Sequence, residues 1–222
     1  MVDGTSVADA AAVLQNLAAG GRVLELAIGT GRVALPLSAR GVDVAGIELS
    51  KAMLARMRAK AGGKSLPVTV GDMTSARVEG PFSLVYLVFN TIMNVTTQAG
   101  QVAVFRNAAS HLAPGGAFLI ECMVPELRRL PDGEVHVVFD ASEDHFGIDE
   151  YDVVTQSLIS HHFTKLPDGR WDYGTGPFRY AWPAELDLMA RLAGLRLHHR
   201  WGDWDRREFD DTSTRHVSIY GK

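Results

Sequence analysis

Short apolar runs alternate with amphipathic segments along the first 122 residues of the chain. Five runs have the length of buried strands, and they lie at 22–27, 42–48, 66–70, 82–89 and 117–122. Apolar residues recur at helical spacing in most of the intervening segments. Strands separated by helices require crossover connections, which produce a parallel sheet with helices on both faces. The pattern therefore predicts a doubly wound α/β domain.

After residue 122 the helical periodicity weakens. Stretches such as "EVHVVFD" and "RWDYGTGPFRYAW" are separated by turn signals, and we expect two or three antiparallel strands there, the middle two forming a hairpin. A helix from Pro183 to Gly194 and two further strands follow. The chain thus divides into a core (1–122), an inserted antiparallel β cap (123–182) and the end of the core (183–222). The predicted fold is a mainly parallel, Rossmann-like sheet with a terminal antiparallel strand.

Composition and charge narrow the range of partners. The 222 residues are 46% hydrophobic and carry a net charge of −4, so the basic surplus that favours nucleic acid or an anionic membrane is missing. The longest apolar runs have the length of a strand and are too short to span a membrane. The N-terminus lacks the pattern of a signal peptide, and the single cysteine, Cys122, cannot form an internal disulfide. We expect a cytoplasmic protein that acts on a small molecule and binds neither nucleic acid nor membrane.

The stretch "VLELAIGTGR" joins the first strand to a glycine turn. Such a turn lets the backbone approach a ligand closely. Gly29 to Ala34 fit the pattern G-x-G-x-x-A, and Glu48 follows at the distance of the ribose-binding acid of dinucleotide folds. The turn alone suits both a dinucleotide and S-adenosylmethionine.

Three features argue against the dinucleotide. Glu25 lies inside the first strand, where dinucleotide folds have an apolar residue, and a buried carboxylate needs a partner. The chain turns antiparallel after its fifth strand, although a dinucleotide fold continues with a second βαβαβ half. Asp72 and Asn90 place polar groups at the carboxyl ends of two strands, the edge at which such sheets bind ligands.

The sequence resembles the class I S-adenosylmethionine-dependent methyltransferases. "VLELAIGTGRVALPL" is similar to their first motif, "GIELSKAML" to the acidic end of their second strand, and "VGDM" to their adenine-contacting turn. "LAPGGAFLIE" is similar to the motif around their fifth strand. The resemblance covers about residues 20–122 and resumes in "HVSIY". It implies S-adenosylmethionine as cofactor and S-adenosylhomocysteine as product.

The resemblance also implies roles for residues around the glycine turn. Glu25 helps to hold the methionine amine through the turn, and Gly29 and Gly31 admit the cofactor backbone. Glu48 accepts hydrogen bonds from both ribose hydroxyls, with Leu49 next to it in the same motif.

At the neighbouring strand ends, the resemblance implies that Asp72 binds the adenine amino group and that Met73 packs beside the ring. Asn90 lies near the methionine end. The alternative for Glu48 and Asp72 is a helix cap or a solvated strand end. The chain departs from the family at Ala27, which replaces a common first glycine, and in having only about twenty residues before the first strand. We therefore expect that an N-terminal lid over the cofactor is either missing or supplied by another chain.

The cap carries most of the candidate acid–base groups. Uninterrupted alternation over 151–164 places His161 on the more apolar face with Tyr151 and Phe163, and His162 on the opposite face. Because the apolar face should cover the cleft, His161 is the first candidate for a general base, and His162 the second if the register shifts by one. His145 is a further candidate. The alternative is that these side chains only pack or decorate a strand.

We interpret the chain as a methyltransferase that acts on oxygen, nitrogen or carbon of a small molecule, as a monomer or a homodimer. The histidine and carboxylate spacings match no zinc or magnesium site, so no metal is expected. Three other interpretations share the same features. They are a dinucleotide-dependent (NAD-type) oxidoreductase, a non-methylating S-adenosylmethionine-binding protein, and an enzyme that modifies protein or RNA.

Overall fold

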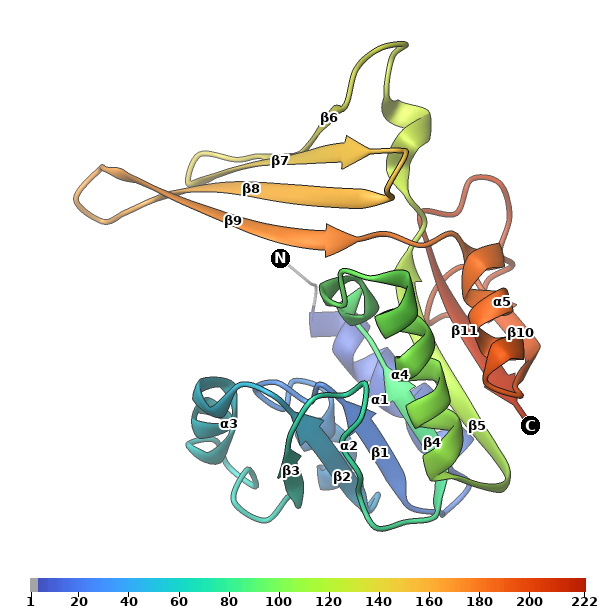
Figure 1. Cartoon of the computed structure of the whole chain (residues 1–222). Helices are drawn as coiled ribbons and strands as arrows, with labels where there is room; N and C mark the ends of the chain where they lie inside the picture. The colour runs from blue at the N-terminus through green and yellow to red at the C-terminus, as the bar shows by residue number, and fades with distance from the viewer. Residues whose placement is uncertain (1–3) are drawn as a thin grey trace.

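A seven-stranded sheet forms the centre of the molecule in this computed structural model, which describes residues 4–222 and, for residues 4–6 and 129, only the backbone. The strand order is β10-β11-β5-β4-β1-β2-β3 (Figure 1). The strands are β1 (Val23–Leu26), β2 (Val44–Glu48), β3 (Val68–Val70), β4 (Phe82–Leu87), β5 (Leu112–Met123), β10 (Arg196–Trp201) and β11 (Arg215–Gly221). Strands β1 to β5 pair in parallel and β11 pairs antiparallel with β5. The predicted fold class is confirmed.

Helices cover both faces of this sheet. They are α1 (Gly4–Ala18), α2 (Ala34–Ala39), α3 (Lys51–Arg58), α4 (Gln98–His111) and α5 (Pro183–Leu192), with 3-10 helices η1 (Thr91–Asn94) and η2 (Glu126–Arg129). Helices α4 and α5 pack on one face and α1 and α2 on the other. An apolar cluster lies on each face of the sheet. In β4, Val85 and Leu87 belong to the cluster on the α4 and α5 side, and Leu84 and Tyr86 belong to the cluster on the α1 and α2 side. This strand is buried on both faces because crossover helices cover a parallel sheet on both sides. No helix within residues 4–222 has the length and apolar character needed to cross a membrane.

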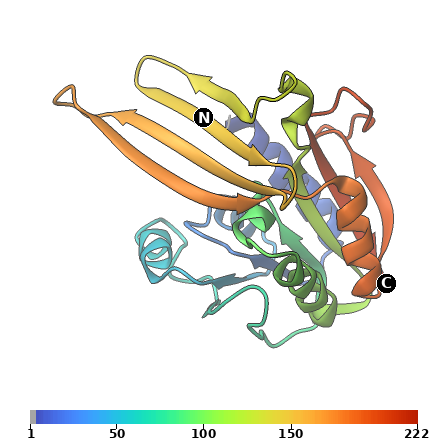
Figure 2. The ribbon, with the colours of Figure 1, turned by 45° about the horizontal axis from the view of Figure 1, so that its top comes forward.

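A second, four-stranded antiparallel sheet forms the cap. Its strands are β6 (His136–Ala141), β7 (His145–Asp152), β8 (Ser157–Lys165) and β9 (Trp171–Arg179), paired in chain order. Figure 2 shows this sheet projecting as an arm from the central sheet. The cap therefore has more strands than the two or three expected from the sequence.

The cap also corrects the expected face of β8. The alternation assumed over 151–164 is broken by a turn, in which Gln156 has a φ of +57° and the Asp152 carboxylate accepts from the Val154 N–H at 2.9 Å. Tyr151 pairs with Leu158, so it shares a face with the even-numbered residues of β8. The expectation that His161 lies on the face of Tyr151 is wrong, because the turn resets the alternation.

Arg179 connects the cap to the core. This residue is 5% exposed, and its side chain donates to Gln101 of α4 at 2.6 Å, to Gln156 of the β7–β8 turn at 2.9 Å and to Glu185 of α5 at 2.7 Å. Gln101 donates in return to the Arg179 carbonyl at 3.0 Å. Burial opposes ionisation of Glu185, but hydrogen bonds from Gln98, Arg179 and Gln156 outweigh it and lower the pKa of this carboxyl. We call Arg179, Gln101, Gln156 and Glu185 the arginine cluster.

Replacing Arg179 by methionine should lower the free energy of unfolding by about 3–5 kcal/mol, because the half-buried Glu185 carboxylate loses its charged partner and the buried Gln101 side chain loses its donor. The matched control is Arg170→Met in the β8–β9 turn. The exposed ion pair of Arg170 with Asp168 should contribute less than about 1 kcal/mol. Urea unfolding of both variants checks the difference. Equal, small losses would show that the arginine cluster does not hold the cap in place.

Candidate functional site

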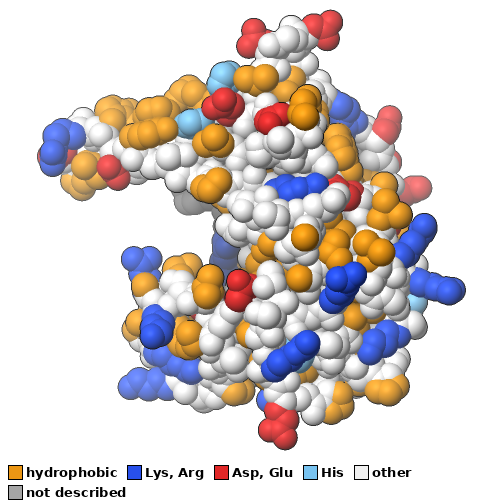
Figure 3. Space-filling view, in the orientation of Figure 1, with side chains coloured by type: hydrophobic (Ala, Val, Ile, Leu, Met, Phe, Trp, Pro, Cys, Tyr) orange, Lys and Arg blue, Asp and Glu red, His pale blue; other side chains and the backbone are white. Residues whose placement is uncertain are grey.

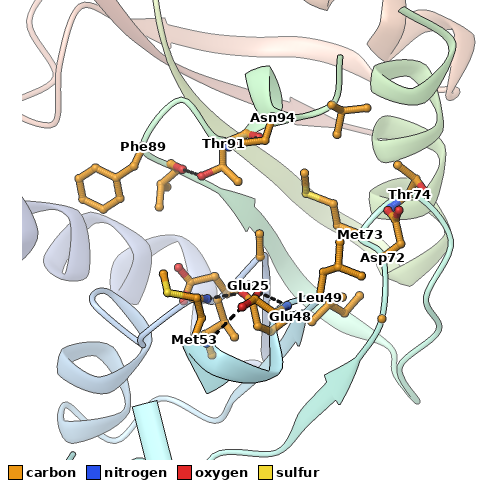
Figure 4. Close-up of a pocket in the computed structure, with 18 of the residues that line it drawn as sticks. Glu25, Glu48, Leu49, Met53, Asp72, Met73, Thr74, Phe89, Thr91 and Asn94 are labelled. Atoms are coloured by element: carbon orange, nitrogen blue, oxygen red, sulfur yellow. Dashed lines mark hydrogen bonds between the residues drawn. The ribbon is translucent and has the colours of Figure 1, made fainter. Parts of the chain in front are cut away.

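A cavity of about 730 Å³ lies at the carboxyl ends of β1, β2, β3 and β4. Its walls come from the turns that follow these strands and from η1 (Figure 4). The chain leaves β1 toward β2 on one side and later returns to β4 on the other side. Parallel sheets bind ligands at this type of switch point in strand order. The volume is in the range of pockets that enclose small ligands.

The glycine turn forms one wall of this cavity. Gly29 and Gly31 have φ values of +57° and +73°, and Ala27 also adopts the left-handed conformation at +53°. A Cβ atom on Gly31 would lie 2.8 Å from the Met57 side chain, so this glycine allows the turn to pack against α3. A Cβ on Gly29 would have no contact closer than 3.8 Å. Glycine thus avoids backbone strain at position 29, and at position 31 it avoids both backbone strain and a clash with Met57.

Glu48 connects this turn to the end of β2. Its carboxylate accepts from the Gly29 N–H and the Ser50 N–H, each at 2.7 Å (Figure 4). Each carboxylate oxygen has a second lone pair, and the side chain lines the cavity. Glu48 can therefore accept hydroxyl hydrogen bonds while it holds the turn in place.

Glu25 is a buried carboxyl group at the base of the same cavity. It is 4% exposed, and the Tyr86 hydroxyl donates to it at 3.0 Å. Burial raises the pKa of Glu25 to about 8, although hydrogen bonds from Tyr86 and the Ala34 N–H and the charge of Arg32 act in the opposite direction. At neutral pH this group holds a proton, which a ligand cation would displace.

The turn after β3 contributes Asp72 and Met73. Asp72 is exposed, and its carboxylate accepts from the Thr74 N–H at 2.7 Å, as in a turn cap. It also lines the cavity together with the buried Met73 and with Leu49, which is 67% exposed. The capping role and the cavity-lining position therefore occur in one residue.

The turn after β4 is strained and separates two cavities. Phe89 and Asn90 have φ values of +58° and +59°, which non-glycine residues rarely adopt and which cluster at functional sites. The Phe89 N–H donates to the buried Glu121 at 2.6 Å, and the Asn90 side chain accepts from the Met123 N–H at 2.6 Å. Asn90 lines the neighbouring cavity, whereas Phe89 lines both.

This second cavity, of about 270 Å³, lies between the cap and the carboxyl ends of β4 and β5. Figure 3 shows the molecule hollowed beneath the projecting cap. The cap contributes Phe139, Asp149, Leu158, Ser160, His162 and Phe178, and the core contributes Phe89, Asn90, Met93, Asn94 and Met123. Phe89 and Asn94 belong to both cavities. An apolar lining with a few polar groups is typical of small-molecule sites.

Sequence reasoning did not select Phe89, Asn94, Asp149 or Ser160 as site residues. Asp149 pairs with Ser160 across β7 and β8, so both face the cavity together. The signal that could have identified them is the turn at 153–156, which sets this register.

The three candidate histidines are divided between the two faces of the cap, with His145 and His162 on one face and His161 on the other. His162 lines the second cavity, and its Nδ1 lies 3.0 Å from Nε2 of His145. His161 is on the opposite face, where it contacts the Tyr173 hydroxyl at 2.8 Å and Glu150 at 3.3 Å. Their catalytic roles stay predictions.

Comparison with known proteins gives consistent matches. Residues 23–116, which include the glycine turn and the ends of β2, β3 and β4, match a family model described as a methyltransferase domain. The solved CcbJ methyltransferase from Streptomyces caelestis is 37% identical, with a TM-score of 0.88 over 97% of this chain and 88% of that chain. The cypemycin N-terminal methyltransferase of a Streptomyces species is 27% identical over 80% of this chain and 74% of that protein. A dTDP-4-amino-2,3,4,6-tetradeoxy-D-glucose N,N-dimethyltransferase of Saccharopolyspora spinosa is 35% identical over 45% of this chain and 39% of that protein.

The protonated state of Glu25 predicts a specific dependence of stability on pH. Between pH 5 and 8 the native protein holds a proton that the unfolded chain has lost, so the contribution of Glu25 to stability falls as pH rises, by about 1.4 kcal/mol per pH unit. Glu25→Gln has no such slope, because an amide does not titrate. Urea unfolding of both proteins across this range measures the difference. A difference that stays constant with pH would contradict a protonated Glu25.

Proposed function

This chain belongs to the S-adenosylmethionine-dependent methyltransferases, and we propose that it transfers the methyl group of S-adenosylmethionine to an amine nitrogen of a small molecule. Family membership rests on the methyltransferase-domain match and on the 37% identity to a solved methyltransferase over nearly the whole chain. S-adenosylmethionine is therefore the cofactor and S-adenosylhomocysteine the product. The observation that carries the choice of nitrogen is Asp149, a carboxylate that faces the second cavity among phenylalanine side chains.

An amine acceptor matches the chemistry of this cavity. A carboxylate forms charge-assisted hydrogen bonds with an ammonium group, and aromatic faces such as those of Phe139 and Phe178 attract cations. A hydroxyl acceptor can also donate to the carboxylate, but it carries no positive charge, so it gains neither the ion pair nor the attraction to the aromatic faces. The amino-sugar enzyme is named an N,N-dimethyltransferase, and the cypemycin enzyme is named for methylation at an N-terminus, where a peptide carries an amino group. These names support, on independent grounds, the same acceptor atom.

The first cavity fits the cofactor. Its volume suits a ligand of this size, and the unobstructed surface at Gly29 leaves room for close approach. In our assignment Glu48 accepts from the ribose hydroxyls, and Asp72 binds the adenine amino group with Met73 and Leu49 beside the ring. Glu25 stabilises the methionine ammonium group through the glycine turn, and its buried proton is lost on binding.

The chain contributes to the reaction by positioning and by excluding water. S-adenosylmethionine supplies an electrophilic methyl group, which the amine lone pair takes while the electron pair of the broken bond stays on sulfur. Phe89 and Asn94 line both cavities, so they define where the two reactants meet. The apolar walls formed by Met93, Leu158 and Phe178 keep water from this junction.

Matched pairs of acceptors test the choice of nitrogen. Sugars that differ only in carrying an amino or a hydroxyl group at one carbon are incubated with the enzyme and with S-adenosylmethionine labelled in its methyl group. We expect label in the amino sugars and none in their hydroxyl counterparts, as measured by mass spectrometry. Equal labelling of the hydroxyl sugars would refute an amine-specific site.

The assignment of Glu48 is tested by calorimetry with S-adenosylhomocysteine. Glu48→Ala should weaken binding roughly 10- to 100-fold, because hydrogen bonds to a charged group are worth about 1.5–3 kcal/mol. The control is Asp43→Ala. Asp43 directly precedes β2, at the end of the strand opposite to Glu48, and its replacement removes only an exposed ion pair with Arg22. Glu48→Gln keeps the shape of the side chain and should also weaken binding. Unchanged affinity in both Glu48 variants would contradict the ribose contact.

A further inference from the structure

We propose that five cap side chains form a hydrogen-bonded chain that carries a proton from the acceptor in the second cavity to the outer end of the cap. In order, they are Asp149, Ser160, His162, His145 and Asp140. We call this series the proton chain. The inference rests on the proposed amine acceptor, which reaches the site as an ammonium ion and has no free lone pair until it loses a proton.

Four contacts connect the proton chain. The Ser160 hydroxyl lies 2.7 Å from the Asp149 carboxylate and 3.2 Å from Nε2 of His162. Nδ1 of His162 lies 3.0 Å from Nε2 of His145, whose Nδ1 lies 2.8 Å from the Asp140 carboxylate. All four are within hydrogen-bond distance. The series therefore runs without a gap from a cavity-lining carboxylate to a partly exposed one.

Four hydrogen bonds need four protons, and two arrangements supply them. In the first, Asp149 holds the extra proton and donates to Ser160, which donates to His162, which donates through Nδ1 to a neutral His145. In the second, His145 is doubly protonated and donates to both His162 and Asp140, while His162 donates to Ser160 and Ser160 donates to an ionised Asp149. Both arrangements contain the same protons, and both satisfy all four contacts. Shifting one proton along each of the three bonds between Asp149 and His145 converts one arrangement into the other, while His145 donates to Asp140 in both.

The pKa values of the two carboxyl groups that end the proton chain, Asp149 and Asp140, are shifted in the directions that outward proton transfer requires. Burial raises the pKa of Asp149, so this carboxyl accepts a proton more readily than an ordinary aspartate, although its hydrogen bond from Ser160 opposes the shift. The hydrogen bond from His145 lowers the pKa of Asp140, which therefore stays ionised at the outer end. The other titratable groups that act on Asp149 are Glu126, His161 and His162. The Phe139 ring packs on His145 and His162 and shields the middle of the proton chain.

The proton balance is complete without a further reactant. Asp149 takes one proton from the acceptor ammonium, which leaves a neutral amine with a lone pair. The proton shift then places an additional proton on His145, whose side chain is 26% exposed and releases a proton to water beside Asp140. After methyl transfer the nitrogen is again cationic, and the same route removes the next proton.

Three variants test the proton chain with an amino-sugar acceptor and labelled cofactor. Ser160→Ala breaks the series while keeping both ends, and His162→Gln removes its centre. His136→Gln, at the exposed start of β6 in the same cap, is the matched control. At pH 6 the first two should lower kcat at least tenfold with little change in the KM for the cofactor, because proton transfer by a positioned group is typically worth 10²–10⁴. Their deficit should shrink as pH rises to 9, where the free amine is already neutral. The control should stay within twofold at every pH.

Two results would overturn the proton chain while leaving the amine acceptor intact. One is full activity of Ser160→Ala and His162→Gln at pH 6. The other is an equal loss at every pH, which indicates a structural role only. Failure of every amine to accept label instead overturns the proposed function.

If no amine accepts label, a measurement that needs no acceptor still tests the proton chain. Imidazole ¹⁵N spectra of the complex with S-adenosylhomocysteine report the pH at which His145 becomes doubly protonated. Asp149→Asn should shift this pH in the wild-type background and much less in the Ser160→Ala background. Loss of Ser160 interrupts the coupling of His145 to Asp149 through the proton chain, and only the direct electrostatic effect of the Asp149 charge then remains. Equal shifts in both backgrounds would contradict the proton chain.

Discussion

The buried guanidinium of Arg179 is the interaction on which the arrangement of the two sheets depends. A charged group that is almost fully buried is stable only with its partners, and these lie on α4, on α5 and in the β7–β8 turn. The cap is therefore held where the partners on α4 and α5 reach β9. Together with the packing of Tyr151, Leu158 and Tyr180 into the core cluster, this constraint positions the arm seen in Figure 2 and gives the second cavity defined walls.

The two cavities have different origins and different chemistry. The first is built from turns that follow parallel strands, so its residues are set by short local motifs around Gly29, Glu48 and Asp72. The second requires the cap, and its polar residues come from β7 and β8. The strained turn at Phe89 and Asn90 lies where they meet. In the function we propose, the core supplies the methyl donor site and the cap determines the acceptor.

Local patterns in the sequence were sufficient for the core. The five strands, the glycine turn and the carboxylates at the strand ends could be predicted because burial and backbone conformation act within a few residues. The dinucleotide alternative, which the glycine turn also allowed, is not supported by the methyltransferase match and whole-chain similarity.

The cap could not be predicted to the same depth. A four-residue turn shifted the alternation and exchanged the faces of His161 and His162, and the pairing of Asp149 with Ser160 follows only from that register. The arginine cluster joins positions 78 residues apart, which no local pattern reveals.

The most direct test is a crystal structure of the protein with S-adenosylhomocysteine and an amine acceptor bound together. The account predicts the homocysteine end in the first cavity and the acceptor nitrogen in the second, within hydrogen-bond distance of the Asp149 carboxylate and facing the junction at Phe89 and Asn94. An acceptor nitrogen bound on the opposite face of the cap, beside His161 and Tyr173, would contradict it.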